Sequence, residues 1–221
     1  MENEKEYNIK KWKRIMNVTQ NNYANMLKRL NRQHKVSNYV LIYYSIFLIV
    51  ITLTSKYFPT YFNAGLGEYF GIILSIIVLA YSLINNSANY AVRITNIEDA
   101  INKIKTIKRG LESKDLNELI DRYNAVTDTT ELRSDVDFFI TVKQLCKKNN
   151  MCWFTVKFKS KMDEMDYSEE QRQIKDYISE LSLLVEEVKI ISEYVWYAIL
   201  FLIPIVIFLI CILSEMEINI L

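Results

Sequence analysis

Three stretches of the chain lack charged residues for long enough to cross a lipid bilayer. They cover residues 36–54, 69–84 and 194–213, and the second continues without charge to Val92. A helix needs about 20 apolar residues to cross the hydrocarbon core. Because so small a soluble domain could hardly bury three such runs, we predict an all-α membrane protein with a transmembrane hairpin and a third, C-terminal span.

Outside the spans, apolar residues recur in steps of three and four, which is the spacing of helices packed along a seam. The repeating positions are Ile9, Trp12, Met16, Thr19, Tyr23, Met26 and Leu30 in the N-terminal helix (1–35), Tyr90, Ile94, Ile97, Ile101, Ile104 and Leu111 after span two, and Ile174, Ile178, Leu181, Val185 and Val188 before span three.

The long middle segment (85–193) contains two stretches of similar length that bear this pattern. We predict that 87–111 is an unbroken helix that descends from span two, and that 168–193 is a helix that returns to span three. Together with the N-terminal helix they would form an antiparallel, coiled-coil-like cytoplasmic stalk. Gly110 is predicted to end the descending helix, and Ser168 and Gln171 have capping-box spacing at the start of the returning one. Two shorter helices are expected between them.

The distribution of basic residues predicts the orientation in the membrane. Nine lysines and arginines precede the first span and seventeen lie in 85–193, whereas the loop between the first two spans has only Lys56 and the tail (214–221) has none. The positive-inside rule therefore places the N-terminus and the middle segment in the cytoplasm, and the C-terminus outside the inner (plasma) membrane. The net charge of +1 gives no reason to expect nucleic-acid binding.

The second span begins with a stripe of small residues, Gly67, Gly71 and Ser75, spaced four apart. Small residues at this spacing let two membrane helices approach closely, so we predict that Gly67 and Gly71 are helix-packing positions. The alternative is that Gly65 and Gly67 only shape the loop.

Small polar residues recur every seven positions along the first two spans. They are Asn38, Ser45 and Thr52 on the first span, and Ser75, Ser82 and Asn89 on the second. Two interpretations stay open: these side chains line a water path in an assembled pore, or they hydrogen-bond one helix to another. A single chain has too few spans to enclose a pore, so the first interpretation requires a homo-oligomer.

The sequence offers little conventional chemistry. His34 is the only histidine, the three cysteines lack metal-type spacing, and no phosphate loop or nucleophile motif is present. We therefore expect no catalytic residues, no metal and no cofactor, and the chain is not expected to be an enzyme. The best ligand candidates are the basic and aromatic residues Lys147, Lys148, Trp153, Lys157 and Lys159. The alternative is a solvated lysine face over a small aromatic core.

The order of parts resembles the SLATT family of bacterial membrane effectors. The similarity lies in the basic run "MLKRLNRQHKVSNYVLIYYSIFLIVITL", the short outer hairpin, the helix "NYAVRITNIEDAINKIKTIKRGLES" and the segment "LNELIDRYNAVTDTTELRSDVDFF", roughly residues 25–139. The third span departs from the two-span family pattern. The resemblance implies a pore-forming or membrane-disrupting effector of anti-phage defence, triggered by a nucleotide second messenger or a partner sensor.

Two hypotheses about function follow. The first is an oligomeric, gated effector that permeabilises the membrane and causes growth arrest or death. The second is a membrane-anchored scaffold or sensor subunit that binds a partner protein through its coiled-coil-like helices without forming a pore. The polar stripes on spans one and two favour the first hypothesis.

Overall fold

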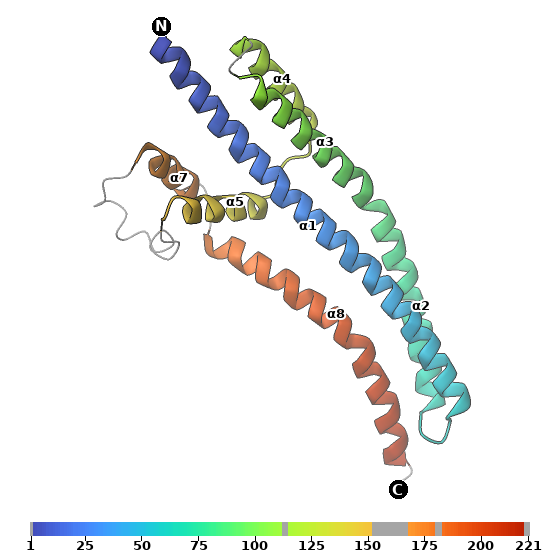
Figure 1. Ribbon diagram of the computed structural model, residues 1–221. Helices are drawn as coiled ribbons and strands as arrows, with labels where there is room; N and C mark the ends of the chain where they lie inside the picture. The colour runs from blue at the N-terminus through green and yellow to red at the C-terminus, as the bar shows by residue number, and fades with distance from the viewer. Residues whose placement is uncertain (1, 112–114, 152–167, 180–182, 219–221) are drawn as a thin grey trace. The chain divides into compact units, whose positions relative to one another are not determined.

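The computed structural model describes residues 2–111, 115–151, 168–179 and 183–218, and all the regular elements in these ranges are helices (Figure 1). They are α1 (Glu2–Tyr57), α2 (Ala64–Ser87), α3 (Tyr90–Arg109), α4 (Leu116–Thr129), α5 (Asp135–Lys148), α7 (Glu169–Ser179) and α8 (Leu183–Ile218). The predicted all-helical class is confirmed.

Three helical stretches are long and apolar enough to cross a membrane, namely Glu4–Tyr57, Ala64–Arg109 and Leu184–Met216. They contain the three predicted spans. The predicted N-terminal helix and the first span form one continuous helix, α1.

The chain divides into two compact units. One, which we call the charged unit, comprises Met1–Asn31 and Ala91–Ile191. The other, which we call the membrane unit, comprises Arg32–Tyr90 and Ser192–Leu221. Both α1 and α8 contribute residues to each unit, and each unit is described by itself below.

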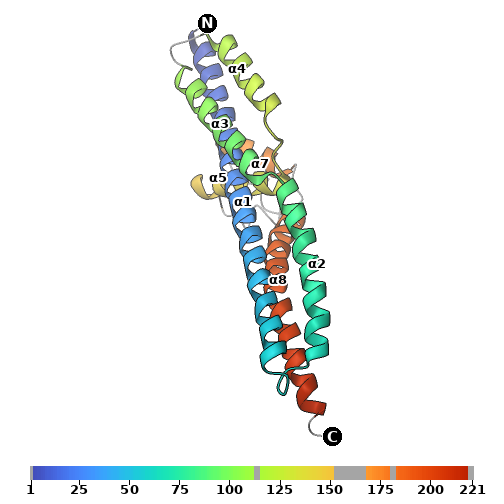
Figure 2. The same ribbon diagram turned by 90° about the vertical axis from the view of Figure 1, so that its right-hand side faces the viewer.

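In the membrane unit, α1, α2 and α8 lie side by side (Figure 2). Their shared core consists of buried residues from all three helices and the loop between the first two: Val40, Tyr44, Ile51, Phe62, Leu74 and Cys211. Aromatic rings fill the space between α1 and α8, with Phe47 and Phe208 centroids 5.9 Å apart and Tyr43 and Phe201 centroids 5.3 Å apart. The interior of a single chain is therefore packed with side chains.

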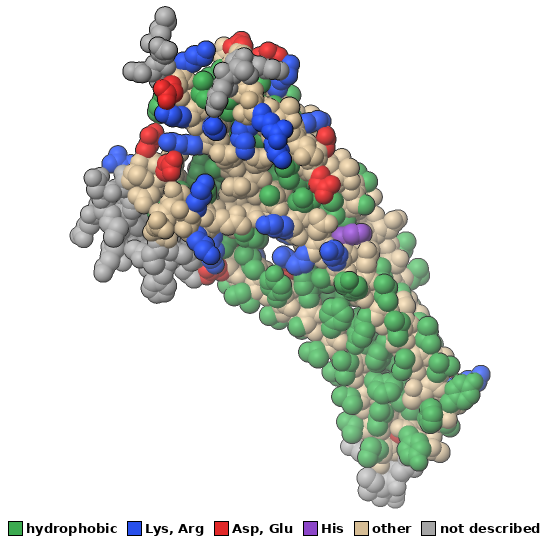
Figure 3. Space-filling view, viewed as in Figure 1, with side chains coloured by type: hydrophobic (Ala, Val, Ile, Leu, Met, Phe, Trp, Pro, Cys, Tyr) green, Lys and Arg blue, Asp and Glu red, His purple; other side chains and the backbone are tan. Residues whose placement is uncertain are grey.

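The outer surface of the membrane unit is apolar. In the most apolar stretch of each span, few residues are buried: 22% of them in the first span and 11% in each of the other two. Exposed aliphatic residues such as Ile49, Leu79 and Leu202 cover the outside of the three helices. Figure 3 shows hydrophobic side chains over this unit and charged side chains gathered on the other. This is the surface expected of helices that face lipid.

A proline interrupts the hydrogen-bond ladder of α8, and α1 compensates for it. Pro204 lies inside α8 and has no N–H, so the Leu200 carbonyl four residues earlier lacks its helical donor. The Tyr44 hydroxyl on α1 donates to that carbonyl at 2.8 Å. A neighbouring helix thus supplies the partner that the proline removes, as membrane interiors require.

The charged unit is organised around the N-terminal part of α1. Four of its predicted seam positions, Met16, Tyr23, Met26 and Leu30, are buried, as are Ile97, Ile104 and Leu111 from the predicted seam of the descending helix. Polar contacts tie α1 to the other helices of the unit. The Thr19 hydroxyl lies 2.7 Å from the Tyr123 hydroxyl of α4, and Arg29 forms a two-pronged ion pair with Asp137 of α5, at 2.9 and 3.0 Å.

The caps in the charged unit follow from local sequence. α3 ends at Arg109, immediately before Gly110, as predicted. At the start of α7 the Ser168 N–H donates to Gln171 Oε1 at 3.0 Å and the Gln171 N–H donates to the Ser168 hydroxyl at 3.4 Å, which confirms the predicted capping box. α5 begins with a second capping box, between Ser134 and Asp137.

One prediction about helix continuity was wrong. Span two and the descending helix are separate, because α2 ends at Ser87 and Asn89 has a φ of 48°. Asparagine is one of the few residues that adopt this left-handed conformation readily. The predicted returning helix is described in two parts, α7 and α8, and residues 180–182 between them lie outside the described residues. Ile174 and Ile178 on α7 are buried against α5, whereas Val185 and Val188 on α8 are 51% and 62% exposed, so the seam does not continue along α8.

Candidate functional site

A cluster of polar side chains links α1 and α2 at one end of their spans. The Ser37 hydroxyl donates to Asn85 Oδ1 at 2.6 Å and lies 3.1 Å from the Tyr81 hydroxyl. The Asn85 amide in turn donates to Asn38 Oδ1 at 3.2 Å. Ser37 is buried, so these bonds satisfy polar groups that lipid would leave without partners.

The same end of α1 is linked to α8 by charged groups. Arg32 Nη2 lies 2.8 Å from Glu193 Oε2, and Gln33 Nε2 lies 3.5 Å from Glu193 Oε1. The Tyr197 hydroxyl donates to the same carboxylate at 2.6 Å. The Arg32 guanidinium also sits over the Tyr194 ring, 5.2 Å from its centroid. We call the α1–α2 and α1–α8 contacts together the polar junction.

The polar junction is only partly closed off from its surroundings. The side chains of Arg32 and Glu193 are 32% and 19% exposed. Arg32 Nε and His34 Nδ1 are buried and have no hydrogen-bond partner among the described residues. The half-buried ion pair joins α1 to α8, and the contacts of Ser37 and Asn38 with Asn85 join α1 to α2.

The four predicted pore-lining residues that bear hydroxyls do not lie in the interior of the membrane unit. Ser45, Thr52, Ser75 and Ser82 are exposed on the membrane unit. The hydroxyls of Ser45 and Thr52 donate at 2.8 Å to carbonyls four residues earlier in α1, and that of Ser75 donates at 2.7 Å to the Ile72 carbonyl. Their own helices satisfy these three hydroxyls, so no second helix of the same chain is required.

The two asparagines of the predicted stripes have different surroundings. Asn38 is half-buried in the polar junction. Asn89 lies beyond the end of α2, where its amide donates to the Ser87 carbonyl at 3.3 Å, so it does not share the helix face of Ser75 and Ser82.

The two glycines predicted to pack helices differ in how closely they are approached. A Cβ at Gly67 would lie 2.6 Å from a Phe62 ring carbon and 3.2 Å from the Ser55 Cβ. At Gly71 the nearest atom, Leu48 Cδ1, would be 3.9 Å away, which is ordinary contact. Within one chain, close packing of the hairpin therefore depends on Gly67.

The predicted ligand residues are only partly described. Lys147 and Lys148 are exposed at the C-terminal end of α5. Trp153, Lys157 and Lys159 lie outside the described residues.

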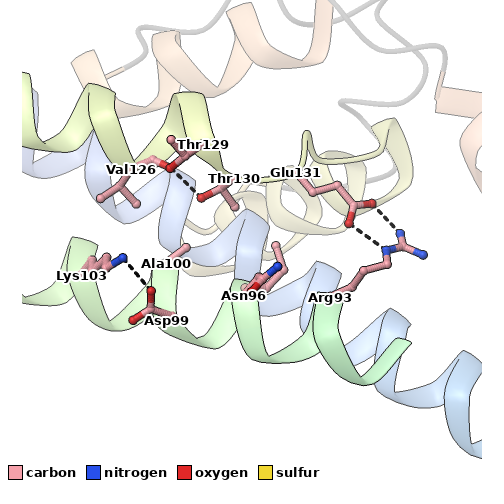
Figure 4. Close-up of a pocket in the computed structure, with 10 residues that line it drawn as sticks. Arg93, Asn96, Asp99, Ala100, Lys103, Val126, Thr129, Thr130 and Glu131 are labelled. Carbon is pink, nitrogen blue, oxygen red and sulfur yellow. Dashed lines mark hydrogen bonds and ion pairs between the residues drawn. The ribbon is translucent and has the colours of Figure 1, made fainter. Parts of the chain in front are cut away.

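A pocket of about 270 Å³ lies between α3 and α4 of the charged unit (Figure 4). The charged side chains that line it are paired: Arg93 with Glu131 at 2.8 Å, and Lys103 with Asp99 at 2.7 Å. Two threonines in the wall donate to the carbonyl of Val126. Because these groups satisfy one another, the pocket presents a neutral wall.

Sequence reasoning missed the polar junction and the Arg29–Asp137 pair. The junction joins residues that are 44 to 161 positions apart, so no local spacing reveals it. Polar residues at the ends of the spans, Ser37 and Asn85 above all, were the available signal. For Asp137 the signal was its capping-box spacing from Ser134.

The fold and the junction define a helical membrane protein whose apolar helices are tied together at one end by polar side chains. Residues 5–210 match the family described as SMODS and SLOG-associating 2TM effector domain family 5 (SLATT_5), and the chain belongs to that family. The match confirms the resemblance and extends beyond residues 25–139 to include most of the third apolar helix. The chain is therefore a membrane effector. No curated protein and no solved structure matches it.

Proposed function

We propose that the chain is an oligomeric effector that opens a pore in the inner membrane and arrests or kills the cell in anti-phage defence. The trigger is a nucleotide signal or a partner sensor. The N-terminus and the middle segment face the cytoplasm, and the C-terminus faces outward.

One observation carries this proposal. The interior of the membrane unit is filled by packed aromatic and aliphatic residues, while Ser45, Thr52, Ser75 and Ser82 lie on its outer surface. A water path through one chain would have to displace that core. A path between chains can be lined by these outward hydroxyls, because they lie on the surface of the membrane unit and not in its core.

Leucine substitution tests which role the outward hydroxyls have. Ser45→Leu and Ser75→Leu should leave the oligomer intact but reduce dye or ion leak from liposomes, because a hydrophobic constriction gates a pore by dewetting. The matched control is Ser87→Leu. Ser87 is also exposed and its hydroxyl donates to a carbonyl three residues earlier at 2.9 Å, but it lies outside the heptad stripe.

The decisive measurement is leak rate divided by oligomer yield, for each variant at equal protein. Leak that persists in both stripe variants contradicts the pore. Parallel loss of leak and oligomer indicates that the serines only join helices, in which case each substitution should cost less than about 2 kcal/mol. An intact oligomer with no leak in the parent protein favours the scaffold or sensor alternative.

Cysteine labelling tests the orientation. We expect an impermeant maleimide to label Thr60→Cys, in the exposed loop between α1 and α2, in intact cells. Asn124→Cys, on the exposed face of α4, should react only after the cells are opened. The background needs Cys152→Ser, since Cys146 and Cys211 are buried. The reverse labelling pattern would contradict the orientation.

A further inference from the structure

A second cavity in the charged unit is basic, unlike the neutral pocket of Figure 4. It has a volume of about 360 Å³ and is lined by residues of α1, α3, α5 and α7. Its wall contains three cationic side chains, Arg14, Lys108 and Lys148, and one carboxylate, Glu170. The four helices thus surround a hollow with an excess of positive charge.

Lys108 is the most constrained of these cations. Its Nζ donates to two neutral amide oxygens, those of Asn17 at 2.9 Å and Gln20 at 2.6 Å. An ammonium has three donors, so the described contacts use two of them. Burial lowers the pKa of Lys108, and the nearby charges of Lys13, Lys105 and Arg109 lower it further. A desolvated cation among like charges gains stability from any anion that reaches it.

Arg14 is held loosely in the same wall. Its nitrogens lie 3.7 Å from Glu169 and 3.7 Å from Glu170, which is beyond hydrogen-bond distance. Both carboxylates are more than half exposed, so the attraction is weak and easily replaced. A guanidinium in this state is available for the two-pronged contact that arginine makes with phosphate.

We propose that this cavity binds the phosphate group of a small phosphorylated ligand through Arg14, Lys108 and Lys148. The cavity is within the size range of small-molecule sites, and amide side chains from α1 and α7 supply further hydrogen-bonding groups beside the cations. The phosphate can come from a soluble compound or from a lipid headgroup. A bound anion would join four helices of the charged unit. The idea that this ligand triggers the effector rests on the proposed function. Binding itself can be measured without a leak assay, so the two can fail independently.

The test is calorimetric titration of the full chain in a non-ionic detergent, with two probes: pyrophosphate and dihexanoylphosphatidylglycerol. We expect saturable binding of at least one probe, weakened by added salt. Lys148→Gln should weaken it about tenfold or more, because a charged hydrogen bond is lost. Lys147→Gln is the matched control, since it removes the same charge from the adjacent exposed position, which does not line the cavity.

The outcomes separate the sources and the alternatives. Binding of pyrophosphate alone identifies a soluble ligand, and binding of the lipid alone identifies a headgroup. Binding of neither probe overturns the proposal, as does equal weakening by Lys147→Gln and Lys148→Gln, which indicates diffuse attraction. Lys108→Gln should also weaken binding, and circular dichroism at the titration temperature must show that this variant is folded, because Lys108 also joins α3 to α1. If the chain binds a probe but causes no leak from liposomes, the proposed pore is contradicted and the proposed binding site is supported.

Discussion

Tyr44 donates a hydrogen bond that Pro204 makes necessary, and the two residues should therefore be energetically coupled. The Tyr44 side chain is 4% exposed, and its hydroxyl is the observed donor to the Leu200 carbonyl. Tyr44→Phe keeps the ring but leaves that carbonyl without a partner in an apolar environment. An unsatisfied buried acceptor costs about 1–3 kcal/mol, whereas hydrogen bonds inside membranes average about 0.6 and reach about 1.7 kcal/mol. We expect a loss of about 1–1.5 kcal/mol.

Combining this substitution with Pro204→Ala gives a double-mutant cycle, whose second half removes the proline that deprives the Leu200 carbonyl of its donor. Pro204→Ala restores an N–H that can donate to the Leu200 carbonyl, so Tyr44→Phe in that background should cost less than about 0.5 kcal/mol. The coupling energy should be about 1 kcal/mol. Tyr43→Phe is the matched control. Its hydroxyl donates at 3.1 Å to the Phe201 carbonyl, whose helical donor, the N–H of Ile205, is present whichever residue occupies 204.

Reversible unfolding in mixed micelles, with rising mole fraction of dodecyl sulfate and followed by circular dichroism, gives the four free energies of the cycle. If Tyr44→Phe costs the same with proline and with alanine at 204, the hydroxyl is not compensating for the missing N–H. If Tyr43→Phe shows the same coupling, the effect belongs to the α1–α8 contact as a whole.

Two further predictions concern packing and pH. Gly67→Ala should destabilise the hairpin by about 1–3 kcal/mol, because the added methyl group meets the fully buried Phe62. Gly71→Ala, measured in the same micelle assay, should be neutral or stabilising by up to about 1 kcal/mol, and equal losses at both sites would contradict the packing described here. Burial raises the pKa of the Cys146 thiol to about 11, so Cys146 should resist alkylation at pH 8 in the folded protein. The thiol of the unfolded chain ionises near pH 8.5. The stability that the buried, protonated Cys146 thiol contributes should therefore be complete below that pH and fall as the pH rises towards 11. Cys146→Ala should lack this decline.

The sequence predicted those features of the fold that depend on one helix at a time. Charge-free length identified the three apolar helices, and the three-and-four spacing identified the buried face of α1, as Met16 and Leu30 show. Prediction from the sequence failed where the structure of a segment depends on its backbone conformation or on a neighbouring helix. Asn89 breaks the helix through a backbone conformation that an apolar pattern does not encode. Val188 fits the seam spacing but is exposed, because periodicity does not reveal whether a partner is present.

The candidate site was less predictable than the fold for the same reason. The small residues of the spans were visible as stripes, yet only the packed structure shows that Ser45 and Ser75 point outward while Ser37 points into the polar junction. The charged contact between Arg32 and Glu193 joins residues 161 positions apart. The basic cavity draws on four helices, and of its cations only Lys148 belonged to the basic segment that the sequence favoured.

The hydrogen bonding of the membrane unit bears on how the proposed effector can exist as a single chain in lipid. The described hydroxyls of Ser45, Thr52 and Ser75 are satisfied by their own helices, and the core is filled, so a lone chain can lie in lipid with little drive to assemble. In the proposed function, the trigger must then change what the chain presents outward. α1 is one continuous helix, and it bears Arg14 of the basic cavity, Arg32 of the polar junction and Ser45 of the outward stripe. In the proposed function, a ligand that contacts Arg14 therefore contacts the helix that also bears Arg32. An equilibrium shifts only by the difference in ligand affinity between its two states. For the proposed anion to act as the proposed trigger, it must therefore bind the charged unit more tightly in the proposed oligomer than in the single chain.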